Sequence, residues 1–350
     1  MPATTAMAQC ERQPSIGILS RALSQVQPGY DQVSTDDRDH MVSYRCCVPT
    51  SEVPRVIAVV GPTATGKSAL GVALARALGG EVVNADSMQL YRGMDIGTAK
   101  LTVAEREGVP HHVLDVWDVT EPASVAAYQR LARAAVDDIA SRGKVPVLVG
   151  GSGLYVRAVL EEFEFPGTDP MLRARLEDEL SSAGPALLYS RLRELDPVAA
   201  DKILPSNGRR IVRALEVIEL TGAPFTAALP SPRPHYASVH IGVDRDAAEL
   251  DDRIATRVGL MWAAGLVDEV RVLERQGLRE GRTASRALGY QQALAELDGV
   301  FTDAQARAET TRATRRFVRR QRSWFRRDPR IAWLDGGSPT LVADALAAAR

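Results

Sequence analysis

The segment at residues 61–68 has the spacing GxxxxGK[ST] of a phosphate-binding P-loop. It follows an apolar run at 56–60 and precedes a helical pattern at 67–78, which is the context the motif needs. Backbone N–H groups of such a loop converge on an anion at a helix N-terminus. Lys67 would add positive charge, and the Ser68 hydroxyl could hold Mg²⁺. The loop predicts a di- or triphosphate site formed by Gly61, Pro62, Thr63, Ala64, Thr65, Gly66, Lys67 and Ser68.

A carboxylate, Asp86, follows the next expected strand, at 81–85. Ligands of parallel sheets bind at the carboxyl ends of the strands, so we expect Asp86 to face the phosphate site. Kinases and ATPases usually place a further acid after another apolar strand to help hold magnesium. The candidate strand at 145–149 is instead followed by Gly150, Gly151 and Ser152. Asp86 could therefore be a general base, or a helix N-cap or simple metal ligand; the residues alone leave these open.

The elements that must position these residues alternate between strand and helix. This pattern predicts an α/β fold, with a P-loop NTPase-like parallel sheet flanked by helices on both faces. Residues 166–237 differ, because a helical stretch is interrupted by prolines, and we interpret them as a helical insertion domain that forms a lid. The core would then consist of 54–165 and 238–350. We expect strands at 56–60, 81–85, 145–149 and 239–243, and helices at 67–78, 124–141, 246–276 and 303–327.

Residues 1–53 are polar and aperiodic, which predicts a disordered N-terminal extension, and Met41 could be the true start. The three cysteines, Cys10, Cys46 and Cys47, all lie in this segment and form no CxxC pair. We therefore expect neither a disulfide framework nor a zinc site. The chain has no long apolar run and no secretory signal pattern, so we expect a cytoplasmic protein that does not enter a membrane.

Positive charge is concentrated near the C-terminus. The chain has a net charge of −1, yet ten arginines and only two acids lie between Gln305 and Arg330. Phe317, Val318, Trp324 and Phe325 form an apolar stripe on the same expected helix. Such a helix fits contact with a phosphate backbone. The alternative is a surface helix whose arginines pair with acids elsewhere in the chain.

Asp86 opens a fifteen-residue run, DSMQLYRGMDIGTAK, at 86–100. This run, the loop GPTATGKS and the later segment VGGSGLY at 149–155 closely resemble the tRNA dimethylallyltransferases, also called tRNA isopentenyltransferases. Further matches are Arg210, the segment at 213–217, and Leu288-Gly289-Tyr290. The resemblance covers about residues 55–335, essentially everything after the extension.

The resemblance implies transfer of a dimethylallyl group from dimethylallyl diphosphate to N6 of the adenine at tRNA position 37, with release of diphosphate. It implies Mg²⁺ as cofactor, held by Ser68, and the P-loop as the diphosphate site. Asp86 matches the family's general base, and Lys67, Thr63 and Arg257 complete the implied catalytic set. Arg257 lies four residues after Arg253, so the two share a helix face. Without the family, a solvated charged face is the simpler interpretation of that pair.

The resemblance also implies that tRNA is a partner and that the insertion faces it. Gln291 stands where many relatives have a basic residue, and Ser152 where a threonine is commoner. His111 and His112 are interpreted as structural or tRNA-adjacent, not as metal ligands. The implied tRNA contacts are Asp86, Ser87, Met88, Gln89, Ser152, Arg173, Arg209, Arg210, Ile211, Val212, Arg213, Arg286, Gly289, Tyr290, Gln291, Arg316 and Arg320.

Three alternatives compete with this interpretation. An adenylate isopentenyltransferase would prenylate free AMP, ADP or ATP, but the arginine-rich helix and the insertion favour a macromolecular acceptor. A small-molecule ATP-dependent kinase is disfavoured by the missing acid after Val149. A non-catalytic RNA-binding protein would leave Lys67, Ser68 and Asp86 without a purpose. We expect a monomer.

Overall fold

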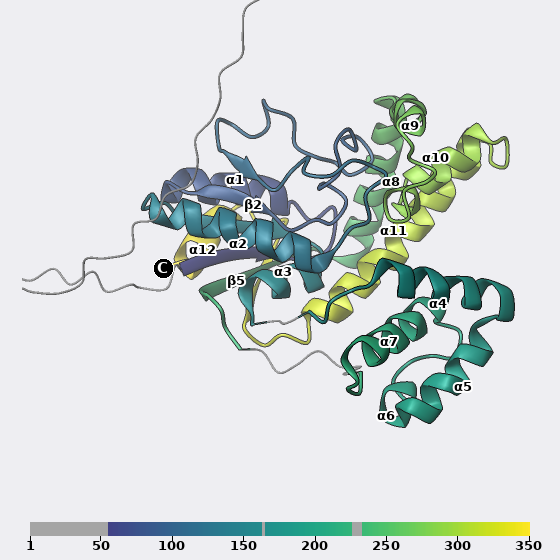
Figure 1. The fold of residues 1–350 in the computed structure, drawn as a ribbon. Helices are drawn as coiled ribbons and strands as arrows, with labels where there is room; N and C mark the ends of the chain where they lie inside the picture. Colours follow the sequence, from purple (N-terminus) through teal and green to yellow (C-terminus); the bar gives the residue numbers. More distant parts are fainter. Residues whose placement is uncertain (1–54, 163–164, 226–232) are drawn as a thin grey trace, which may run out of the picture. The chain divides into compact units, whose positions relative to one another are not determined.

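The computed structural model describes residues 55–162, 165–225 and 233–350, all within one compact unit (Figure 1). The described strands form one parallel sheet in the order β3-β2-β4-β1-β5-β6, so the predicted fold class is confirmed. The strands are β1 (Arg55–Val60), β2 (Glu81–Asn84), β3 (His111–His112), β4 (Pro146–Gly150), β5 (Ala237–Asp244) and β6 (Ile331–Asp335). The two edge strands, β3 and β6, were not among the expected strands.

Alternate residues of β1 face two separate apolar cores. Val56 and Ala58 belong to the core that includes residues of α2 (Val125–Ser141) and α3 (Gly153–Leu160). Ile57 and Val59 belong to the core formed with α1 (Lys67–Leu78) and α12 (Leu341–Ala348). Successive side chains of a strand point to opposite faces, so a strand that is covered on both sides is apolar throughout.

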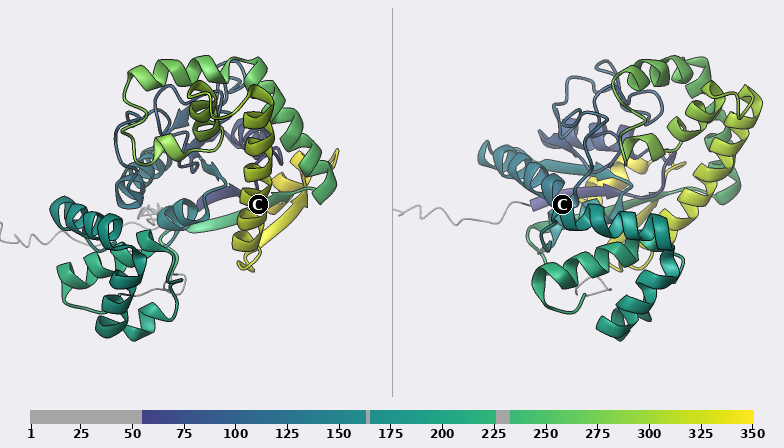
Figure 2. Two further views of the ribbon diagram at one scale, coloured as in Figure 1. Left: turned by 90° about the vertical axis from the view of Figure 1, so that its right-hand side faces the viewer. Right: turned by 45° about the vertical axis from the view of Figure 1, so that its right-hand side comes forward.

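Four further helices follow β5 on the C-terminal side of the insertion: α8 (Ala247–Ala263), α9 (Leu266–Arg275), α10 (Tyr290–Leu297) and α11 (Asp303–Phe325). The single helix expected at 246–276 is two helices, because Gly265 has a φ of 93° and ends α8 in a left-handed turn. Helix α11 begins with a capping box in which Thr302 and Gln305 each bond the other's backbone N–H. Its 23 residues make it long enough to run past several elements of the core (Figure 2).

The insertion contains α4 (Pro170–Ala183), α5 (Pro185–Leu195), α6 (Pro197–Ala200) and α7 (Gly208–Thr221), which surround an apolar core of their own (Figure 2). Pro170, Pro185 and Pro197 each begin a helix instead of interrupting one, because a proline at the first helical position loses no hydrogen bond. The expected division at residues 166 and 237 stays a prediction. The expected disordered extension, Met41, the three cysteines and most of the proline-rich exit lie outside the described residues.

No helix among the described residues is both long enough and apolar enough to span a membrane.

Candidate active site

The carboxyl ends of β1, β2 and β4 surround a cavity of about 200 Å³. The P-loop, Asp86, Gly150, Gly151 and Arg257 all line it, although Arg257 comes from α8, far along the chain. The structure therefore brings together the residues of the predicted catalytic set: Thr63, Lys67, Asp86 and Arg257, with Ser68 beside them. Their gathering follows from the parallel sheet, in which the turns after neighbouring strands meet at one edge.

The P-loop has a backbone that ordinary residues adopt rarely. Gly61 and Gly66 have φ angles of 135° and 102°, and a Cβ on Gly61 would lie 2.2 Å from the Val243 carbonyl oxygen. Ala64 has a φ of 67°, which is unfavourable for a residue with a side chain. No side chain caps the N-terminus of α1 after Gly66. The first N–H groups of this helix therefore stay available to an anion.

Two arginines hold the strained part of this loop through its carbonyl groups. Arg253 Nε donates to the Ala64 carbonyl oxygen at 2.9 Å, and Arg245 Nε donates to that of Thr65 at 3.1 Å. Both Arg253 and Arg257 therefore contact the P-loop, although Arg253 itself is an exposed residue. Arg253 supports the loop from behind, whereas Arg257 Nη1 reaches the Thr63 hydroxyl at 3.3 Å and lines the cavity.

The charges around the cavity shift one another's pKa values. Burial lowers the pKa of Lys67 to about 8, and the Arg257 cation acts in the same direction against the attraction of Asp86. Burial also lowers the pKa of Arg257. The pKa of Asp86 is raised by burial, although the Met88 N–H and the Lys67 cation oppose this. Two partly buried cations facing one carboxylate leave a net positive site, which favours an anionic ligand.

Asp86 is fixed in a tight turn after β2. Its N–H donates to Asn84 Oδ1 at 2.9 Å, and its Oδ1 accepts from the Met88 N–H at 2.9 Å. Residues 87–90 form a bend and a turn, so Asp86 is not a helix N-cap. Tyr128 Oη donates to the Asn84 carbonyl oxygen at 2.9 Å and secures the turn from α2. The carboxylate is thus held toward Lys67 by local hydrogen bonds.

Two hydroxyl groups lie beside Asp86. Ser87 N–H and Ser87 Oγ are each 3.4 Å from Ser152 Oγ, which joins the turn after β2 to the turn after β4. Gln89 lines the cavity and donates to the Thr98 carbonyl oxygen at 3.1 Å. The predicted contacts Ser87, Gln89 and Ser152 are therefore neighbours of the carboxylate.

Several predicted RNA contacts in the insertion have side chains that are engaged within the protein. Ile211 and Val212 are almost fully buried within the core of the insertion, so their side chains cannot reach an external partner. Arg173 and Arg213 both pair with Glu216, which has no exposed surface, so these arginines neutralise a buried carboxylate. Arg209 and Arg210 are exposed on the same helix, α7.

The side chain of Tyr290, another predicted RNA contact, also faces the interior of the protein. Its side chain is fully buried, and its hydroxyl donates to Glu269 Oε1 at 2.5 Å. Glu269 also accepts from the backbone N–H of Ile96 at 2.8 Å. Tyr290 therefore anchors the segment after Asp86 to helices α9 and α10, and Gly289 beside it is also buried. Arg286 and Gln291 on either side of this pair are exposed.

Both interpretations of the arginine-rich helix describe part of α11. Arg322 is largely buried and binds Asp244 through two nitrogens, at 3.0 and 2.7 Å, so it serves the protein interior. Arg316 pairs with Glu309 at 3.3 Å. Arg320 makes no ion pair within the described residues and lies over the Phe317 ring. Arg316, Arg320 and Gln291 line one open cavity of about 670 Å³ between α10 and α11, which keeps them candidates for RNA contact.

Gln321 is a functional candidate that sequence reasoning missed. It is 6% exposed, and its Oε1 accepts from the Thr63 N–H at 3.0 Å. Its Nε2 donates to the Gly151 carbonyl oxygen at 2.9 Å. One amide thus joins the P-loop to the turn after β4. The signal that could have found it is a lone amide on the buried stripe of α11, between Val318 and Phe325.

Fold and site together define a P-loop protein of the parallel α/β class with a positively charged cavity and one partly buried carboxylate, Asp86. A family model described as IPP transferase matches residues 89–328. A tRNA dimethylallyltransferase of Salinispora arenicola is 76% identical over 295 residues, which cover 84% of this chain and 86% of the relative. That of Streptomyces coelicolor is 70% identical over 284 residues, covering 81% and 91%.

Solved structures agree with these relatives. A eukaryotic dimethylallyltransferase acting on tRNA is similar with a TM-score of 0.73 and 28% identity, covering 84% of this chain and 77% of that chain. The tRNA isopentenylpyrophosphate transferase of Bacillus halodurans gives a TM-score of 0.63 and 41% identity, covering 84% and 94%. The chain therefore belongs to the tRNA dimethylallyltransferase, or IPP transferase, family.

Replacing Gln321 by leucine should weaken binding of inorganic diphosphate by about tenfold, because both hydrogen bonds of the amide are lost and the Thr63 N–H is left unpaired. Isothermal titration calorimetry would measure this affinity. Thr310→Val is the matched control, because it removes another buried polar group of α11 that bonds only within the helix. A folded Gln321→Leu protein with the affinity of the wild type would show that the amide does not position the loop.

Proposed function

We propose that this protein transfers a dimethylallyl group from dimethylallyl diphosphate to N6 of the adenine at position 37 of tRNA and releases diphosphate. The names of its relatives support this activity. The observation that carries the mechanism is the carboxylate of Asp86, which faces Lys67 and Arg257 across one small cavity with the P-loop. A base and an anion site so close together suit a reaction in which N6 of the adenine loses a proton while the neighbouring dimethylallyl carbon loses diphosphate.

The P-loop in this proposal holds a leaving group. Negative charge grows on the bridging oxygen as the bond from carbon to oxygen breaks. The N–H groups at the start of α1, Lys67 and Arg257 would stabilise that charge, and because they are held in place beforehand, they need no rearrangement. The Thr63 hydroxyl, which accepts from Arg257, would orient the guanidinium toward the diphosphate.

The residues present fit the proposed Mg²⁺ cofactor. No cluster of three or more His, Cys, Asp or Glu side chains suited to a metal occurs in the described part of the chain. We therefore do not propose a site in which protein side chains alone surround the ion. Mg²⁺ commonly takes one or two protein oxygens and fills its remaining positions with phosphate oxygens and water. Ser68 would supply the protein oxygen, since it lines the cavity beside Lys67. When bound, the ion would help neutralise the departing diphosphate.

Asp86 would accept the proton from N6. The exocyclic amine of adenine is a poor nucleophile because its lone pair is delocalised into the ring. As N6 forms its bond to the dimethylallyl carbon, a nearby base that takes the proton lowers the barrier. Burial raises the pKa of Asp86 and makes it a stronger base than an ordinary aspartate. The hydroxyls of Ser87 and Ser152 lie where they could bond the adenine edge.

Exposed cations distant from the cavity would bind the RNA backbone. Among the predicted contacts, the arginines that remain accessible or line an open cavity are Arg209 and Arg210 on α7, Arg286 before α10, and Arg316 and Arg320 on α11. Neutralising phosphates with such side chains gives strong but salt-dependent binding. The expectations of a cytoplasmic location and a monomer stay predictions.

The variant Asp86→Asn should keep its affinity for diphosphate and lose turnover by a factor of about 10²–10⁴. The wild-type rate should rise with pH as Asp86 loses its proton, at a pH above the ordinary aspartate value of about 3.9. This acid limb should be missing from the residual activity of the variant. Steady-state rates between pH 5 and 9 would test both points, with the exposed Asp118→Asn as control. Unchanged turnover in Asp86→Asn would remove Asp86 as the base.

The acceptor can be identified with radiolabelled dimethylallyl diphosphate. We expect label to enter an anticodon stem-loop RNA with adenine at position 37, and not the same RNA with guanine there, which lacks the N6 amine. We expect no label in free AMP, because its single phosphate offers the exposed arginines far fewer contacts than the backbone of an RNA. Labelling of AMP at a rate similar to that of the RNA would favour the adenylate isopentenyltransferase alternative.

A further inference from the structure

A buried lysine lies behind one wall of the candidate active site. The side chain of Lys100, the last residue of the run 86–100, is 3% exposed. Its Nζ donates to the Tyr91 carbonyl oxygen at 3.1 Å and to a carboxylate oxygen of Asp95 and of Asp115, each at 2.6 Å. An ammonium has three N–H groups, so all of its donors are used inside the protein. Lys100 therefore holds other parts of the chain and has no donor left for a ligand.

The partners of Lys100 belong to two separate loops. Tyr91 and Asp95 lie in the loop that leads to Lys100, and the Lys100 N–H also donates to the Asp95 carbonyl oxygen at 3.0 Å. Asp115 lies beyond β3 and has a left-handed backbone conformation with a φ of 56°. One ammonium thus joins the loop before Lys100 to the loop after β3, and its bonds to carboxylates are stronger than bonds between neutral groups.

Both loops supply residues to the wall of the cavity that contains the P-loop. Ala99 and Leu101, the two sequence neighbours of Lys100, line this cavity. Leu114, the neighbour of Asp115, lines it as well. The ion pairs of Lys100 therefore fix this apolar wall from behind.

The same ion pairs also fix a polar residue close to Asp86. Gln89 lines the cavity, and its Nε2 donates to the carbonyl oxygens of Thr98 and Ala99, at 3.1 and 3.5 Å. These two residues directly precede Lys100 in the sequence. A change in the position of Lys100 would therefore reach the cavity through Gln89 and through the apolar wall.

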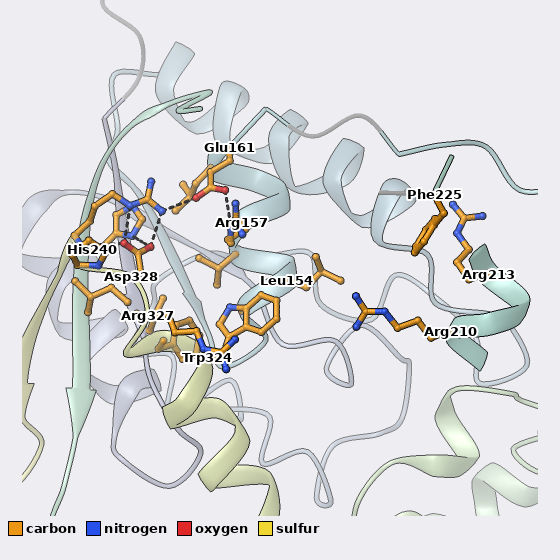
Figure 3. Close-up of a pocket in the computed structure, with 18 residues that line it drawn as sticks. Leu154, Arg157, Glu161, Arg210, Arg213, Phe225, His240, Trp324, Arg327 and Asp328 are labelled. Carbon is orange, nitrogen blue, oxygen red and sulfur yellow. Dashed lines mark hydrogen bonds and ion pairs between the residues drawn. The ribbon is translucent and has the colours of Figure 1, made fainter. Parts of the chain in front are cut away.

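Another cluster of buried charge, at the end of α3, belongs to a different cavity. Figure 3 shows Glu161 beside Arg157, to which it is paired at 2.5 Å, with Asp328 nearby. Arg330 pairs with both carboxylates at 2.6 Å. These four residues line a cavity of about 840 Å³, and none of them lines the cavity of the P-loop. Of the two clusters, the one around Lys100 therefore borders the proposed donor site.

We propose that Lys100 is a positioning residue for the dimethylallyl group of the donor. This inference rests on the proposed function, in which the P-loop holds the diphosphate. The five carbons are the apolar part of that substrate, and Ala99, Leu101 and Leu114 are apolar side chains in the same cavity of about 200 Å³. Lys100 keeps these side chains in place, so the carbon chain buries its surface against a fixed wall. A wall that is fixed in advance costs less free energy on binding than one that the ligand must order.

The test compares two ligands that share the diphosphate and differ in the carbon chain. The variant Lys100→Met replaces the ammonium by an unbranched apolar side chain. Asp95 and Asp115 are 58% and 41% exposed, so they can turn to solvent and the variant buries no unpaired carboxylate.

We expect the Kd of Lys100→Met for dimethylallyl diphosphate to rise about tenfold, which is the effect of exposing roughly two CH₂ groups. Isothermal titration calorimetry in the presence of Mg²⁺ would measure it. The Kd for inorganic diphosphate should not change, because that ligand contacts the P-loop and not the apolar wall. KM for the RNA should not change either. This split between the two ligands would not result from a general loss of stability.

Asp115→Asn is a milder second variant. Asparagine readily adopts the left-handed conformation of this position, so the protein should fold. The variant keeps the pair of Lys100 with Asp95 and weakens the hold on the loop that contains Leu114. We expect its Kd for dimethylallyl diphosphate to rise about threefold, because a charged hydrogen bond becomes a neutral one. Its Kd for inorganic diphosphate should again equal that of the wild type.

Lys144→Met is the matched control. Lys144 Nζ also bonds a buried carboxylate at 2.6 Å, that of Glu81 at the start of β2, the end opposite Asp86. Glu81 keeps its pair with Arg142 in this variant, and both Kd values should match the wild type.

Equal weakening of both ligands in Lys100→Met would overturn the proposal, because the lysine would then support the site as a whole. Unchanged binding of both ligands would overturn it as well. If the wild type prenylates no RNA, the proposed function fails, whereas a loss confined to dimethylallyl diphosphate in Lys100→Met would still support the positioning role of Lys100.

Discussion

The strained backbone of the P-loop is the constraint on which the candidate site depends. Its left-handed turn at Ala64 is held by Arg253 from α8, and its Thr63 N–H is held by Gln321 from α11. These helices follow the insertion in the sequence, so the loop near the start of the sheet is completed by the last third of the chain. A preorganised loop aims its N–H groups before the ligand arrives, which is how fixed dipoles stabilise developing charge most effectively. The phosphate site and the C-terminal helices therefore form one structure.

The sequence predicts well what is encoded by short patterns. The strand–turn–helix pattern locates the P-loop, and Asp86 follows another strand of the same predicted parallel sheet. Because such strands end at one edge of the sheet, it was predictable that the P-loop and Asp86 would line one cavity. Arg257 was placed there through the family resemblance. It is harder to predict from the sequence which side chains of a helix face the protein interior. Ile211 and Tyr290 lie within matched segments, yet their side chains face the interior, because a segment that contacts RNA presents only some of its residues to it.

Charge alone did not reveal how α11 is used. Arg322 is bound by Asp244 in the interior, whereas Arg320 lies at an open cavity, and both belong to one run of arginines. The rotation of α11 about its axis decides which arginines face the interior and which face the open cavity. The local sequence determines this rotation only through the apolar stripe of the helix. The same rotation points Gln321 at the P-loop. One helix thus combines support for the phosphate site with a surface for the proposed RNA.

The central claim is that this P-loop holds a leaving diphosphate and not the transferred group. The most direct measurement is the fate of dimethylallyl diphosphate labelled with ³²P at its terminal phosphorus, in the presence of the stem-loop RNA and without ATP. We predict that all label is released as inorganic diphosphate, one molecule for each adenine modified. Release as orthophosphate, transfer of the label to the RNA, or a requirement for ATP would contradict the account.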